Sequence, residues 1–155
     1  MLNIFKKKKL SELYAPVIGE SLSLDCVPDP VFSSGMMGDG VAFKYEGDTI
    51  CAPCDGEIVL VANTKHAIGI RANGIEILIH VGLDTVNLQG EGFKVLVHVG
   101  DKVKQGAQLL KVDRKLMDDH HINLITPMII TTKDIKLDIC NPNTVDLNSI
   151  VISLK

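Results

Sequence analysis

The sequence is 155 residues long, with 46% hydrophobic and 23% charged residues, values typical of a globular protein with a buried core. It carries 16 basic and 19 acidic residues, and this balance argues against nucleic acid, which needs a basic surface to neutralise its phosphates. No apolar run approaches the roughly 20 residues that span a bilayer, and the apolar start of the chain is too short for a signal peptide. We therefore expect a cytoplasmic protein in which residues 11–155 form a single domain.

Positive charge is concentrated at the amino terminus. Lys6–Lys9 follow one another, and no acidic residue occurs among the first nine positions. We interpret residues 1–10 as a flexible, solvated basic tail. Because Leu2, Ile4 and Phe5 precede the lysines, the alternative is weak peripheral contact with an anionic membrane surface. The remaining chain is acidic, which is compatible with a basic protein partner.

Short segments of alternating apolar and polar residues predict β-strands separated by glycine-containing turns. The predicted strands are residues 21–26, 41–44, 49–52, 57–61, 68–71, 75–80, 108–112, 128–131 and 150–154. One helix is predicted from Arg114 to about Asn123, with Pro127 beyond its end, and a single helical turn around Asp84–Leu88. Strands this short and this regularly spaced predict an all-β fold, an antiparallel β-sandwich or partly open barrel with one or two short helices.

A weak internal repeat supports the same class. Ala15–Glu20 is similar to Ala52–Glu57, and each leads into an alternating segment. Together with Val99–Leu110, the second copy is similar to biotinyl and lipoyl carrier domains, which have a barrel-sandwich hybrid fold. Those carriers present a modified lysine on a hairpin tip, and no such lysine is present here. The repeat therefore predicts a barrel-sandwich hybrid-like architecture with a duplicated motif, without swinging-arm chemistry.

Two of the four cysteines form a CxxC motif, Cys51 and Cys54. A thioredoxin-type motif needs a helix after its first cysteine to lower the pKa of the thiol, but residues 55–61 predict a turn and a strand. A structural zinc site needs a second close pair, whereas Cys26 and Cys140 are isolated. We interpret the cysteines as small apolar residues that fill space at strand ends.

Two histidines lie at the ends of a predicted hairpin. Apolar residues alternate through 68–71 and 75–80, and Asn73-Gly74 between them is a typical hairpin turn. Folding this hairpin brings His66 and His80 together at one rim. Because imidazole can donate, accept or coordinate near neutral pH, the pair predicts a site for an anion or a metal.

Several further motifs accompany the histidines in a fixed order. They are residues 27–32 (VPDPVF), 37–42 (MGDGVA), 52–56 (APxDG), 64–67 (TKHA), 79–86 (IHVGLDTV) and 90–93 (GEGF). With these motifs the chain resembles, from about Ala15 to Leu154, the glucose-type enzyme IIA component of the bacterial phosphoenolpyruvate-dependent sugar phosphotransferase system. The resemblance implies a cytoplasmic phosphocarrier that accepts a phosphoryl group from phospho-HPr and passes it to a cysteine on the IIB domain of a sugar permease. Such a protein is a phosphotransferase component and not a stand-alone turnover enzyme.

The resemblance also implies roles for individual residues. His80 would carry the phosphoryl group on its tele nitrogen, and His66 would assist by donating a hydrogen bond to the phosphoryl oxygens. The accepting ring must be neutral, so we expect its other nitrogen to donate to a backbone carbonyl near Gly82. Thr64, two residues before His66 on the same strand face, is expected to orient the His66 ring through its hydroxyl. No cofactor is required for this chemistry.

A partner-binding rim around the histidines follows from the same resemblance. Its predicted members are Asp29, Val31, Phe32, Met36, Met37 and Asp84. The apolar members are expected to be exposed, with methionine giving an adaptable surface, although the same residues are also suited to a core. Asp84 is expected at the rim, where its carboxylate can meet an arginine or lysine of the donor.

Two other functions use the same residues. His80-x-x-x-Asp84 has the spacing found in lysostaphin-like zinc peptidases, and His66 with His80 can complete a zinc site, although the His-x-His pair of those enzymes is absent. Short of hydrolysis, zinc can still bind His66 and His80 adventitiously or as an inhibitor. The third hypothesis is a regulator whose phosphorylation state reports sugar supply to other proteins.

Overall fold

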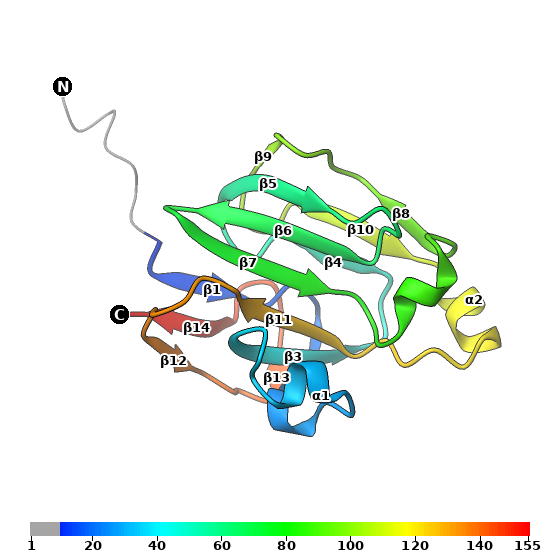
Figure 1. Cartoon of the computed structure of the whole chain (residues 1–155), viewed down its shortest axis with the longest axis horizontal. Helices are drawn as coiled ribbons and strands as arrows, with labels where there is room; N and C mark the ends of the chain where they lie inside the picture. Colours follow the sequence, from blue (N-terminus) through cyan, green and yellow to red (C-terminus); the bar gives the residue numbers. More distant parts are fainter. Residues whose placement is uncertain (1–9) are drawn as a thin grey trace.

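The computed structural model describes residues 10–155. The basic run at residues 6–9, predicted to belong to a flexible tail with weak membrane contact as the alternative, lies outside the described residues. The described chain folds into three antiparallel sheets (Figure 1). The largest has eight strands, in the spatial order β13 (Thr144–Val145), β2 (Gly19–Ser23), β3 (Asp39–Tyr45), β11 (Thr126–Ile130), β7 (Ile75–His80), β6 (Ala67–Ala72), β5 (Gly56–Val61) and β9 (Lys102–Val103). The sheet is open, with β13 and β9 at its edges.

Two three-stranded sheets complete the β structure. They contain β1 (Glu12–Tyr14), β14 (Ile150–Leu154) and β12 (Leu137–Ile139), and then β4 (Thr49–Cys51), β10 (Gln108–Val112) and β8 (Phe93–Val95). The helical segments are short: α1 (Pro30–Ser33), α2 (Arg114–Asp119), η2 (Leu24–Cys26) and η3 (Thr85–Leu88). The predicted class, an antiparallel β-sandwich or partly open barrel with one or two short helices, is confirmed. No helix within residues 10–155 is long and apolar enough to cross a membrane.

The hairpin of β6 and β7 forms as the sequence predicts. Asn73 and Gly74 both have positive φ, 51° and 78°, which is the geometry of a type I′ turn. This turn sets the register that pairs Ala67 with His80 at the other end of the hairpin. Figure 1 shows β6 and β7 side by side, with the carboxyl end of β7 leading into the segment that contains η3.

Apolar side chains pack on both faces of the large sheet. The main core includes Ile68, Ile70, Ile77 and Ile79, all at most 1% exposed. Full burial of such a side chain stabilises the fold by about 1.5–3 kcal/mol. A second, smaller cluster lies on the other face, under η2 and α1, and consists of Leu24, Val27, Phe32, Ala42, Leu83, Ile125 and Ile129.

The residue immediately before each copy of the repeated motif donates a backbone hydrogen bond to the proline of the other copy. Cys51 N donates to Pro16 O at 2.8 Å, and Tyr14 N donates to Pro53 O at 2.9 Å. The glycine near the end of the first copy is held tightly, because a Cβ on Gly19 would lie 2.1 Å from a backbone oxygen. The two copies of the repeat therefore lie close to each other in the structure, joined through the residues that precede them.

Several element boundaries differ from the prediction. The strand predicted for residues 21–26 ends at Ser23, because the Ser23 hydroxyl accepts from Asp25 N and caps η2. The helix predicted to reach Asn123 ends at Asp119, and His121 then adopts a positive φ of 55°. The helix α1 and the strands β1, β8, β9, β12 and β13, of two to four residues each, were not predicted.

Candidate functional site

His66 and His80 face each other at the open end of the β6–β7 hairpin. Their ring centroids are 4.8 Å apart and their planes are nearly perpendicular, at 77°. The backbone joins them as well, because Val81 N donates to His66 O at 2.7 Å. His66 is buried and His80 is half-buried, so one ring is shielded while the other is partly open to solvent. The predicted histidine pair is thus formed in the structure.

His80 is held in one tautomer by its neighbour in the loop. Its Nδ1 lies 2.8 Å from Gly82 O. A carbonyl oxygen can only accept, so Nδ1 carries the proton and Nε2 keeps its lone pair. The Gly82 carbonyl is the acceptor that the sequence analysis expected. The ring can therefore attack an electrophile, or ligate a metal, through Nε2.

His66 is oriented by Thr64, although not on a strand. Thr64 Oγ1 lies 2.7 Å from His66 Nδ1, in agreement with the expected contact. The expectation that both residues share a strand face is wrong, because β6 begins only at Ala67. Thr64 and His66 lie in the preceding turn, where Lys65 has a positive φ of 63° and brings the two side chains together.

Both imidazoles favour the neutral form. Burial lowers the pKa of His80 below its ordinary value of 6.5; His66 lowers it further, whereas the Gly82 hydrogen bond and the charges of Asp29 and Asp84 raise it. Burial likewise lowers the pKa of His66, against a smaller opposing effect of a hydrogen bond with the backbone of Thr64. At neutral pH both rings are therefore uncharged, which is the state that a nucleophilic imidazole requires.

Phe32 does not belong to the exposed rim in which the sequence analysis placed it. Its side chain is only 3% exposed and packs in the second core cluster. Its ring centroid lies 4.8 Å from that of His80, with the planes tilted by 58°. Phe32 is buried because it packs with residues of β3 and β11, and sequence reasoning missed α1, which carries it. The start signal was present, since Asp29 caps α1 and Pro30 is its first residue.

The other predicted rim residues are exposed or partly exposed. Val31, Met36 and Met37 have exposed side chains, and Met36 is 87% exposed. Asp29 is half-buried, and its Oδ1 accepts from Val31 N at 3.0 Å. Asp84 is exposed, with a positive φ of 57°, and makes no side-chain capping bond to η3. Both carboxylates act electrostatically on His80, so they lie near the site.

Thr85 is a buried polar residue beside the site that the sequence did not identify as functional. Thr85 lies in the predicted helical turn after His80, and its side chain is completely buried. Its Oγ1 donates to Val81 O at 2.7 Å. The available signal was a β-branched hydroxyl residue within the 79–86 motif, but its burial depends on tertiary packing.

The cysteines are not placed for chemistry. Cys51 and Cys54 are buried; burial raises the pKa of the Cys51 thiol and, with a contribution from Asp55, that of Cys54 to about 12. The strand β5 follows them, as predicted, so no helix lowers their pKa. Cys26 is exposed, so the interpretation as a space-filling residue is wrong for it. Among residues 10–155, no group of three or more histidine, cysteine or acidic side chains is arranged to hold a metal ion.

A cavity of about 730 Å³ lies away from the histidines. It is lined by residues 10–12, 14, 54–57, 71–73 and 102–105, which include the turn of the β6–β7 hairpin. The histidines lie at the other end of that hairpin. The candidate site is therefore an exposed rim around two imidazoles and not an enclosed pocket.

Comparisons with known proteins point to one family. Residues 11–135 match the family model described as phosphoenolpyruvate-dependent sugar phosphotransferase system, EIIA 1. The chain is 44% identical over 137 residues to the PTS system glucose-specific EIIA component of Oceanobacillus iheyensis, covering 85% of this chain and 83% of that protein. It is 50% identical over 120 residues to the PTS system glucoside-specific EIICBA component of Staphylococcus carnosus. That match covers 77% of this chain but only 17% of the longer relative.

A solved structure has the same fold. The glucose permease IIA from Mycoplasma capricolum superimposes with a TM-score of 0.85 at 37% sequence identity, covering 94% of this chain and 96% of that one. Family model, relatives and fold therefore agree with the motifs around the two histidines: the chain belongs to the enzyme IIA family of the phosphoenolpyruvate-dependent sugar phosphotransferase system.

Proposed function

We propose that this chain is a phosphocarrier of glucose-type sugar uptake and that His80 Nε2 is the atom that carries the phosphoryl group. The observation that carries the proposal is the 2.8 Å hydrogen bond from His80 Nδ1 to Gly82 O. It leaves Nε2 unprotonated, and the lowered pKa keeps the ring neutral near pH 7. A neutral ring with one free nitrogen is what phosphoryl acceptance requires.

The transfer conserves the Nδ1 proton of His80. The Nε2 lone pair attacks the phosphorus of the donor's phosphohistidine, a new P–N bond forms, and the donor's P–N bond breaks with its electron pair returning to the donor nitrogen. In the second transfer a thiolate of the acceptor attacks the same phosphorus, and His80 leaves as neutral imidazole. Such reactions need positioning and charge stabilisation more than covalent assistance.

We assign charge stabilisation to His66. When the Thr64 hydroxyl donates to Nδ1 across 2.7 Å, His66 Nε2 carries the proton and can donate to a phosphoryl oxygen. The 4.8 Å between the ring centroids places His66 beside the ring that would carry the phosphoryl group. Thr64 thus acts as a positioning residue for His66.

The surroundings of the pair support a protein partner. Val31, Met36 and Met37 expose apolar surface, and Asp29 and Asp84 add negative charge close to His80. A basic, partly apolar partner fits this rim, and we propose HPr as donor and the IIB domain of a sugar permease as acceptor. The Staphylococcus carnosus relative supports the second partner, because its name joins EIIC, EIIB and EIIA components in one protein.

The remaining features follow from this role. We propose that residues 11–155 act as one cytoplasmic domain that needs no cofactor, and that any zinc at His66 and His80 is adventitious or inhibitory. Family membership favours the carrier over a lysostaphin-like zinc hydrolase. Regulatory partners that read the phosphorylation state of His80 would use the same site, and this stays a prediction.

Two substitutions test the assignment. The wild-type chain, His80→Gln and His66→Gln are each incubated with phosphoenolpyruvate, enzyme I and HPr, and acid-labile, base-stable phosphate is mapped. We expect His80→Gln to accept no phosphate, and His66→Gln to accept it but to pass it on poorly. Loading of His80→Gln together with loss of loading in His66→Gln would reverse the two roles.

A further inference from the structure

The hydrogen bond that fixes His80 depends on the conformation of a glycine. Gly82 has a φ of 81°, and glycine adopts many conformations at little cost. Its carbonyl accepts from His80 Nδ1, so rotation of the peptide group after Gly82 would remove that acceptor. The same peptide group contains Leu83 N, which donates to Asn123 O at 2.9 Å. One side of Gly82 is therefore held by the segment that leads to β11.

Thr85 holds the other side. Its hydroxyl donates at 2.7 Å to Val81 O, which belongs to the peptide group before Gly82. Its Cγ2 methyl lies only 2.6 Å from the place that a Cβ on Gly82 would occupy, so the methyl covers this glycine. Thr85 is completely buried, and a hydrogen bond is electrostatically stronger in the protein interior than in water.

We propose that Thr85 is a positioning residue for His80, which holds the peptide group before Gly82 and so keeps the Gly82 carbonyl aimed at His80 Nδ1. This inference rests on the proposed function, because the role of Thr85 is to prepare His80 for accepting the phosphoryl group. Thr85 acts through the backbone of Val81 and Gly82, which its hydroxyl and its methyl contact. Its effect is to keep the lone pair on Nε2 by keeping the proton on Nδ1.

The two functional groups of Thr85 can be separated by substitution. Thr85→Val keeps the branched shape and removes the hydroxyl, whereas Thr85→Ser keeps the hydroxyl and removes the methyl. If Thr85→Val does not fold, Thr85→Ala provides the same comparison with Thr85→Ser. The hydroxyl makes the bond to Val81 O, so we expect the serine variant to retain the wild-type behaviour of His80.

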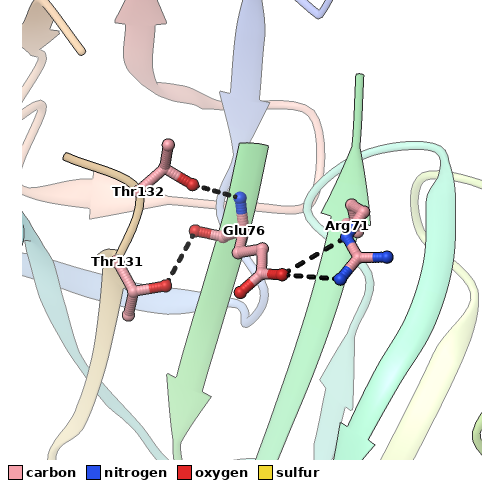
Figure 2. Close-up of polar contacts among 4 residues, drawn as sticks. All are labelled: Arg71, Glu76, Thr131 and Thr132. Atoms are coloured by element: carbon pink, nitrogen blue, oxygen red, sulfur yellow. Dashed lines mark hydrogen bonds and ion pairs between the residues drawn. The ribbon is translucent and has the colours of Figure 1, made fainter. Parts of the chain in front are cut away.

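A matched control contacts β7 at the end opposite His80. Thr132 Oγ1 accepts from Glu76 N at 2.8 Å, so its hydroxyl also holds the backbone of β7 (Figure 2). Figure 2 shows this contact next to the Arg71–Glu76 ion pair, which joins β6 to β7. Thr132→Val therefore removes a comparable threonine-to-backbone bond without changing the loop that contains Gly82.

The first readout is the ring tautomer of unphosphorylated protein, measured by ¹⁵N NMR of the His80 imidazole. We expect the Nδ1–H tautomer in the wild type, in Thr85→Ser and in Thr132→Val, and a mixture of both tautomers in Thr85→Val. The second readout is the loading rate from phospho-HPr. We expect Thr85→Val to load on the order of tenfold more slowly with unchanged affinity for HPr.

The two proposals fail in different ways. If the wild type is not phosphorylated on His80, the proposed function is wrong, while the tautomer comparison still tests Thr85. If Thr85→Val is destabilised like Thr132→Val but keeps the Nδ1–H tautomer and the wild-type loading rate, Thr85 is only structural and the inference is overturned.

Discussion

The two imidazoles of the site differ in the kind of group that holds Nδ1. His80 faces the Gly82 carbonyl, which only accepts, whereas His66 faces the Thr64 hydroxyl, which can also donate. The first contact fixes a free Nε2 for attack, and the second permits a protonated Nε2 for hydrogen bonding. The division of labour that we propose between the two histidines follows from this difference.

The lowered pKa values predict how stability depends on pH. Both histidines have pKa values below 6.5 in the folded chain, so between those values and about pH 6.5 the unfolded chain binds more protons. The contribution of these two histidines to the free energy of unfolding should therefore be constant above about pH 6.5. Below about pH 6.5 the free energy of unfolding should fall as the pH decreases. Denaturation across a pH series measures this, with His80→Gln showing a smaller fall. An identical fall in both proteins would mean that the pKa of His80 is not lowered.

Burial separates two apolar residues that the sequence placed on the same rim. Phe32→Ala should lower the free energy of unfolding by about 3–5 kcal/mol, because it leaves a cavity in the second cluster. Met36→Ala should change it by less than about 0.5 kcal/mol, because that side chain is 87% exposed. Chemical denaturation of the two variants checks both values.

Partner affinity should show the complementary result for Met36. If its side chain contacts the donor, Met36→Ala should weaken HPr binding by on the order of 1 kcal/mol, as measured by titration calorimetry. Unchanged HPr affinity in Met36→Ala would remove this residue from the proposed partner surface.

The strands with a long periodic pattern could be predicted from the sequence. The β6–β7 hairpin was found because isoleucines alternate through both strands and Asn73-Gly74 supplies its turn. The strands β9 and β13, of two residues each, contain too few alternations to be recognised, since they pair only where neighbouring elements bring them together. The contact between Phe32 and His80 could not be predicted either. It depends on how α1 packs against residues of β3 and β11, which are distant in the sequence.

Close packing of backbone between β3 and β11 predicts a second stability effect. A Cβ on Gly40 would lie 2.0 Å from Met128 O and 2.9 Å from Ile129 Cα. Gly40→Ala should therefore destabilise the fold by roughly 1–3 kcal/mol or more, because backbone must move. Gly47 is a matched control, since nothing lies within 4 Å of the place that a Cβ on it would occupy and its φ is not positive. Equal melting temperatures for Gly40→Ala and Gly47→Ala would contradict the strand pairing.

For the whole molecule, the fold class could be predicted because alternating segments recur along most of the chain, and the histidine pair could be predicted because a hairpin turn and two alternating strands bring its residues together. The burial of Thr85 and of Phe32 could not be predicted. Phe32 packs against residues distant in the sequence, and Thr85 lies in a helical turn whose packing no local pattern encodes. The acidic balance of the sequence agrees with a rim where Asp29 and Asp84 lie near His80. Periodicity thus predicted the hairpin that carries the two histidines and the family resemblance implied the residues of the rim, whereas packing determined the geometry of the site.

Metal should act on the whole protein as an inhibitor. We expect zinc to bind weakly between His66 and His80, because coordination needs both unmodified imidazoles and a phosphoryl group on His80 removes one of them. Added zinc should slow transfer from phospho-HPr, and excess chelator should leave transfer intact. His66→Gln should be less sensitive to zinc. Loss of transfer on chelation, restored by zinc alone, would favour a metalloenzyme.

The bond formed at His80 is the central claim of this account. The measurement is a ³¹P–¹⁵N NMR correlation on the ¹⁵N-labelled chain after phosphorylation by phosphoenolpyruvate, enzyme I and HPr. Because Gly82 O holds the proton on Nδ1, the phosphorus should couple to Nε2 of His80. Coupling to Nδ1 of His80, or to any nitrogen of His66, would contradict the account.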